Sequence, residues 1–80
     1  MKQQTLFVST TDLQFISDLT LFCSVNRFCL ILRSSHLLTD CFWCLFAIKY
    51  NGESEKTVKD FLSEYESRCR YSTFEGNVKC

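Results

Sequence analysis

The sequence predicts an α+β fold in which an antiparallel sheet carries two helices on one of its faces. Two kinds of apolar spacing alternate along the 80 residues. Short alternating or continuous apolar runs are typical of strands, and apolar residues three and four positions apart are typical of helices. The order is strand, helix, strand, strand, helix, strand, which is the split β-α-β pattern. We therefore predict a ferredoxin-like βαββαβ fold. It forms a single domain over residues 1–80, with 76–80 as a frayed tail.

The composition fits one small globular domain with no strong electrostatic preference for a partner. Hydrophobic residues make up 46% of the chain and the formal net charge is zero. A neutral chain lacks the attraction that drives phosphate binding, so nucleic acid is disfavoured as a partner. The most apolar window, residues 13–32, is interrupted by Asp18 and Arg27, whereas a membrane-spanning helix needs about 20 consecutive apolar residues. We expect no membrane segment, no signal peptide and a cytoplasmic location.

The first two elements are a strand and a capped helix. Thr5–Ser9 alternates between apolar and polar residues, as a strand does. Thr11 and Gln14 stand at the spacing of a capping box, which predicts that a helix begins after Thr11. The helix should continue to about Val25, with Asn26 as its stop. The apolar residues that carry this prediction are Phe15, Ile16, Leu19, Phe22 and Cys23.

Two strands follow the first helix. Arg27–Arg33 is a short apolar run between charges, and residues 34–40 are polar enough at both ends to form a connection. Cys41–Tyr50 is rich in aromatic and branched residues and is the strongest strand candidate. A buried helix over Cys41–Lys49 is the alternative, because period alone does not distinguish the two for a short apolar run.

The second half ends with a helix and a strand. Asn51 and Gly52 mark a turn, and a helical stripe then runs from Ser54 onward through Val58, Phe61, Leu62, Tyr65 and Cys69. On the opposite side, acidic residues precede basic ones by four positions, in the pairs Glu55–Lys59, Glu64–Arg68 and Glu66–Arg70. Tyr71–Glu75 alternates and is the predicted last strand, which Gly76 ends.

Alternation along the strands predicts which side chains face away from the helices. Successive side chains of a strand point to opposite faces, and a lysine is costly to bury, so Lys49 marks its own face as the open one. The same alternation places five apolar side chains on that face: Phe7, Ile31, Trp43, Leu45 and Tyr71. An exposed patch rich in aromatic residues usually marks an interface. We predict a protein-binding site there, for another protein or a second copy, unless a tail of the chain covers it.

The six cysteines predict free thiols, with a redox or zinc site as the alternative. Without a signal peptide, a reducing compartment is expected. In a strand, Cys41 and Cys44 would face opposite sides and could neither pair nor chelate; in a helix or turn they could. A zinc site would need further ligands from His36, Cys29, Cys69 or Cys80.

No other constellation points to catalysis. His36 is the only histidine, the carboxylates of Asp12, Asp18 and Asp40 are scattered, and the two glycines form no phosphate loop. We therefore expect no enzyme, no metal and no cofactor. Aromatic side chains on an open sheet can stack RNA bases, which makes a nucleic-acid-associated ferredoxin-like protein the alternative. The favoured function is a small non-catalytic protein-binding module, an accessory or inhibitory protein of the kind that phages and plasmids carry.

One stretch carries a resemblance to a known family. The sequence T-V-K-D-F-L-S-E-Y-E-S-R-C-R-Y-S-T-F-E-G, residues 57–76, is similar to the first helix and second strand of the small ferredoxin-fold subunit of the CRISPR adaptation complex. The preceding run Phe42–Tyr50 corresponds to that family's first strand. The family ends this strand with an aspartate, where Lys49 and Tyr50 stand here. The resemblance therefore implies a ferredoxin-like unit and a dimer, and transfers no catalytic residue.

Overall fold

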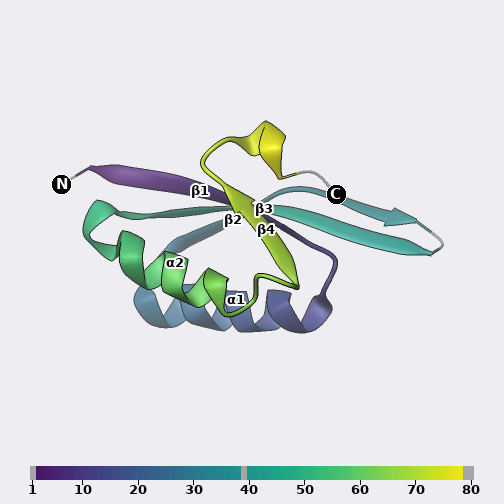
Figure 1. Cartoon of the computed structure of the whole chain (residues 1–80), viewed down its shortest axis with the longest axis horizontal. Coiled ribbons are helices and arrows are strands. Elements are labelled where there is room, and N and C mark those ends of the chain that lie inside the picture. Colours follow the sequence, from purple (N-terminus) through teal and green to yellow (C-terminus); the bar gives the residue numbers. More distant parts are fainter. Residues whose placement is uncertain (1, 39, 79–80) are drawn as a thin grey trace.

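A computed structural model describes residues 2–38 and 40–78 of the chain (Figure 1). Its strands are β1 (Gln3–Thr10), β2 (Cys29–Leu38), β3 (Cys41–Asn51) and β4 (Cys69–Ser72). Its helices are α1 (Leu13–Asn26) and α2 (Glu55–Ser63), and there are two short 3-10 helices, η1 (Gly52–Ser54) and η2 (Glu75–Asn77). The two 3-10 helices are elements that the sequence analysis did not predict.

The four strands form one antiparallel sheet in the spatial order β2-β3-β1-β4. Both α-helices lie on one side of this sheet, and η2 lies on the other side (Figure 1). The predicted α+β class, with a four-stranded antiparallel sheet and two helices, is confirmed. Among the described residues, no helix is both long and apolar enough to cross a membrane.

The main core lies between the sheet and the two helices. The strands contribute the side chains of Leu6, Val8, Cys44, Phe46, Ile48 and Tyr50, and the helices contribute Phe15, Leu19, Cys23, Val58 and Leu62. We call the side of the sheet that carries these residues the helix-covered face. The alternation predicted for β1 and β3 is therefore confirmed on this side. The strand prediction for Cys41–Tyr50 is confirmed as well, and the alternative of a buried helix is wrong.

The first helix begins one residue later than the capping box predicted. Asp12, not Thr11, is the N-cap, and its carboxylate accepts hydrogen bonds from the backbone N–H of Gln14 (2.9 Å) and Phe15 (3.2 Å). Both residues are good caps, and the sequence gives no reason to prefer one. At the other end, Arg27 takes the left-handed conformation (φ 61°), and its backbone N–H donates to the carbonyls of Cys23 and Ser24.

The β2–β3 hairpin is longer than predicted and extends beyond the rest of the sheet. Strand β2 continues to Leu38, so that residues 34–38, predicted as a connection, are paired with β3. A register shift between Leu32 and Ser34 bulges the strand at Arg33. Beyond Cys44 the hairpin has no further partner in β1, and it extends away from the helical layer (Figure 1). We call this extension the arm.

The second helix is shorter than its apolar stripe predicted. It ends at Ser63, the chain turns through residues 64–68, and Cys69 opens β4 opposite Thr10. Cys69 still reaches the core, but from a strand. Of the predicted ion pairs, Glu55–Lys59 is present at 3.8 Å. Arg68 instead lies 3.6 Å from Asp12, because residues beyond Ser63 no longer have helical spacing.

Candidate binding surface

The face of the sheet opposite the helices has its own apolar residues, and we call it the outer face. The strand register places Phe7 beside Ala47, and Ala47 beside Ile31. One step along, Ser9 pairs with Leu45, and His36 pairs with Trp43 on the arm. Because paired residues of neighbouring strands share a face, the prediction that Phe7, Ile31, Trp43 and Leu45 lie on one face is confirmed.

A small second core covers part of the outer face. Trp43 and Leu45 are only 9% and 2% exposed, and Val78, which packs with them, is fully buried. Phe7 is half-buried against this cluster, and Ile31 is half-buried beside it in the sheet. The prediction that Trp43 and Phe7 are both at least partly exposed is therefore wrong for Trp43 and confirmed for Phe7. Strand alternation gave the face of Trp43 correctly, but another part of the chain covers it.

The residues that cover the outer face are 73–78, which we call the covering segment. The chain leaves β4 after Ser72 and forms η2 on the side of the sheet away from the helices (Figure 1). Local hydrogen bonds shape this turn: the N–H of Phe74 donates to Ser72 Oγ (3.0 Å) and the N–H of Asn77 donates to the carbonyl of Phe74 (3.1 Å). The prediction of a frayed tail is wrong for Gly76–Val78, and residues 79–80 lie outside the described part of the chain.

An ion pair holds the covering segment at the far edge of the sheet. The guanidinium of Arg33 donates to both carboxylate oxygens of Glu75, at 3.1 and 3.4 Å. The two side chains are 47% and 40% exposed. Arg33 lies on β2 and the segment starts from β4, so the segment crosses the outer face from one edge strand to the other. Arg33 itself stands at the β2 bulge.

Two buried polar atoms of the outer face lack a hydrogen-bond partner in the described part of the chain. They are Ser9 Oγ and Trp43 Nε1. Ser9 is 1% exposed and pairs with Leu45, so both atoms belong to strands that carry the second core. Buried polar groups in folded proteins nearly always have a partner, so unpartnered ones at one site call for an explanation. Residues 73–78, which pack on this face, form no hydrogen bonds to these two atoms.

Tyr71 does not belong to the outer face, which corrects the sequence-based assignment. It pairs with Val8, whose side chain lies in the main core, so Tyr71 is on the helix-covered side at the edge of the sheet and is 37% exposed. Arg70 and Ser72 take the outer positions, opposite Ser9 and Phe7. The prediction failed because β4 starts at Cys69, which is buried, and ends before Phe74, which is 70% exposed.

The cysteines do not assemble into a redox or metal site within residues 2–38 and 40–78. Cys41 is exposed on the arm and Cys44 is buried in the main core, so the two thiols face opposite sides of β3. The five cysteines of these ranges are unpaired, and no group of three or more metal-binding side chains occurs there. Burial raises the pKa of Cys23 and of Cys69 from 9.0 to about 11, which keeps these thiols protonated and unreactive.

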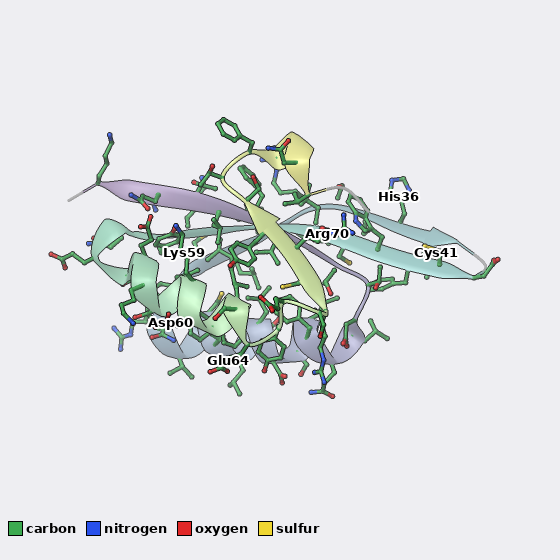
Figure 2. The ribbon with its side chains drawn as sticks, viewed as in Figure 1. His36, Cys41, Lys59, Asp60, Glu64 and Arg70 are labelled. Atoms are coloured by element: carbon green, nitrogen blue, oxygen red, sulfur yellow. The ribbon has the colours of Figure 1, made fainter. Side chains whose placement is uncertain are left out.

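The histidine and the charged side chains of α2 lie far apart. His36 and Cys41 are on the arm, whereas Lys59, Asp60 and Glu64 follow one another along and just after α2 (Figure 2). The His36 ring lies 5.4 Å from the Trp43 ring and is solvent-exposed. A polar pocket of about 350 Å³ lies where β1 ends and β4 begins. Its acids Asp12 and Glu66 are balanced by the bases Arg68 and Arg70, so its charge favours neither anions nor cations.

A second apolar surface, which the sequence analysis missed, lies on α1. Leu13, Leu21 and Val25 are exposed there. Leu21 and Val25 also line a shallow groove with Phe22, Phe61 and Tyr65. The available signal was the near absence of charge: Asp18 is the only charged residue within α1. Exposed apolar patches often mark contact sites, so this surface is a second place where a partner would gain by binding.

Comparisons of the chain with protein-family models, with curated proteins and with solved structures give no match. The stretch Tyr71–Gly76, which the resemblance assigned to one strand, is divided between β4 and η2.

Proposed function

We propose that this protein is a non-catalytic binding module that takes a segment of a partner protein on the outer face of its sheet. The observation that supports this most directly is the way the outer face is covered. An apolar site built from Trp43, Leu45 and Phe7 is filled by a short piece of the chain itself, through one valine side chain. A site that is complementary to a peptide segment in the same molecule has the shape and chemistry to accept one from another molecule.

A non-catalytic binding module acts by occupying a surface of its partner protein. This mode of action agrees with an accessory or inhibitory role. We further propose that the strand arrangement is of the ferredoxin-like type, with β1 and β3 central and β2 and β4 at the edges. In that arrangement the outer face is the natural contact surface, because both helices are committed to the other side.

Two alternatives have less support. Stacking of RNA bases on Trp43 would require the covering segment to leave first, because Trp43 is only 9% exposed. The chain has no net charge to attract phosphate, and Arg33 of this face is already paired with Glu75. A thiol-redox or zinc function would require Cys41 and Cys44 to act together, and they face opposite sides of β3.

Selection from a peptide display library against the full-length protein tests the proposal. We expect enrichment of peptides whose binding is lost in the Ile31→Asp variant, because that substitution places a charge on the uncovered part of the outer face. The matched control is Leu21→Ser, which alters the exposed surface of α1 and should leave binding unchanged. If the selected peptides still bind the Ile31→Asp variant but no longer bind the Leu21→Ser variant, the binding site is on α1. A failure to enrich any peptide would contradict the proposal itself.

A further inference from the structure

We propose that the covering segment is an internal stand-in for the ligand of the outer face, and that the ligand is a peptide with an acidic residue three positions before an aliphatic one. This inference rests on the proposed function and specifies the partner for the same site. The observation behind it is the juxtaposition of two contacts: Glu75 pairs with Arg33, and Val78 packs in one cluster with Trp43 and Leu45.

The spacing follows from the geometry of η2. The turn places Glu75 over the edge strand β2 and, three residues later, Val78 over β3. Arg33 can bind a carboxylate with two parallel hydrogen bonds, which a lysine could not do with the same geometry. The apolar cluster accepts a side chain of the size of valine and excludes water from it. An acid at one end and an aliphatic side chain at the other are therefore the two features that the site selects.

The two positions between these contacts are unrestricted. Gly76 and Asn77 are exposed, and a methyl group placed at Gly76 would meet nothing within 4 Å. Gly76 does not take a positive φ, so its backbone conformation is open to other residues. The expected recognition pattern is thus acidic-x-x-aliphatic, with x unspecified.

The covering segment is attached to the sheet weakly enough to be displaced. The pairing of β4 with β1 ends at Ser72. Apart from the bond to Ser72 itself, the hydrogen bonds that join the covering segment to another element, among the described residues, are those between Arg33 and Glu75. An exposed ion pair contributes little, and segments with few buried contacts open most readily. Departure of residues 73–78 therefore leaves the sheet intact.

A longer ligand would make a contact that the covering segment does not make. Trp43 Nε1 is a donor and Ser9 Oγ is both donor and acceptor, and both are buried without a partner in residues 2–38 and 40–78. A carbonyl of an incoming peptide backbone would satisfy the indole N–H. Such a ligand would replace the covering segment in spite of the high effective concentration that the tether gives to the segment.

The test uses the full-length Val78→Asp variant, in which a charge expels the segment from the apolar cluster, and a capped peptide of residues 73–78 (T-F-E-G-N-V). Trp43 is the only tryptophan, so its emission reports binding directly. We expect saturable binding to the variant and an apparent affinity at least about tenfold lower for the unmodified protein, whose own segment competes. Peptides with Glu75→Lys or Val78→Asp should lose at least about tenfold in affinity, whereas one with Gly76→Ala and Asn77→Gln should stay within about twofold.

A charge exchange adds a control that a merely structural effect would not reproduce. Adding Arg33→Glu to the variant should weaken binding of the unmodified peptide and strengthen binding of the Glu75→Arg peptide. The inference is overturned if Val78→Asp unfolds the protein, if the peptide shows no saturation at millimolar concentration, or if the Glu75→Lys peptide binds equally well. If library peptides bind the outer face without the acidic-x-x-aliphatic pattern, the binding function stands and only this inference fails.

Discussion

At the scale of single residues, burial divides the cysteines into two chemical groups. Cys29 and Cys41 are exposed, whereas Cys23, Cys44 and Cys69 are buried, and burial raises the pKa of each of the latter three. A thiol reacts as its thiolate, so both access and ionisation protect the buried group. We expect a maleimide at neutral pH to label Cys29 and Cys41 rapidly, and Cys23, Cys44 and Cys69 only on unfolding. Peptide mapping by mass spectrometry checks this, and rapid labelling of Cys23 in the folded protein would contradict the main core described above.

Two of these buried thiols, Cys23 and Cys69, predict a loss of stability in alkali. The pKa of Cys23 and of Cys69 is about 11 in the folded protein against 9.0 for a solvated thiol, so the folded state holds its protons more tightly. Their contribution is complete below about pH 9 and is lost as the pH rises to about 11. The urea concentration at the midpoint of unfolding should therefore decrease as the pH is raised from about 9 to about 11. A Cys69→Ala variant should show a shallower fall, and an identical slope in both proteins would refute the assignment.

At the scale of secondary structure, α2 is held by one face only. Val58 and Leu62 are fully buried, whereas Lys56 on the other face is 87% exposed and pairs with Asp60 at 2.8 Å. Leu62→Ala should lower the free energy of unfolding by about 2–5 kcal/mol, because it removes buried area and leaves a cavity. Lys56→Ala should change it by less than about 0.5 kcal/mol, as exposed ion pairs contribute little. Urea unfolding of the two variants measures the difference, and equal effects would mean that the buried face of α2 has been misplaced.

The elements that could be predicted from the sequence are those with a pattern of their own. Cys41–Tyr50 is an unbroken run of strand-forming residues, and the structure extends it by only one residue. The body of α1 follows its helical spacing. The last part of the chain was predicted less well, because Cys69 continues the apolar stripe of α2 and is equally buried as the first residue of β4. Spacing alone does not distinguish these two ways of burying one side chain.

At the scale of the whole molecule, strand alternation predicted most of the candidate site. A tail of the chain was considered as its cover, but the residues that form the cover were not predicted. The face of Phe7, Ile31, Trp43 and Leu45 follows from a period of two within strands that were correctly located. The cover depends on Val78, a single apolar residue in a polar stretch, which has no periodicity to reveal it. Its contact with Trp43 joins residues far apart in the chain, and only the assembled sheet brings them together.

The molecule therefore has two apolar surfaces of different character. The surface of α1 is open, whereas the outer face is partly covered by 73–78 and includes the two polar atoms without a partner among the described residues. We propose the outer face as the binding surface because residues of the chain itself already pack on it, whereas the groove on α1 is open in the described part of the chain.

The central claim is that the outer face is closed by a segment that can leave without unfolding the domain. Acrylamide quenching of Trp43 emission, in the unmodified protein and in the Val78→Asp variant, tests it most directly. We predict weak quenching in the unmodified protein, where Trp43 is 9% exposed, and strong quenching with red-shifted emission in the variant, while far-UV circular dichroism and cooperative urea unfolding persist. Equal quenching in the two proteins, or loss of cooperative unfolding in the variant, would contradict the account.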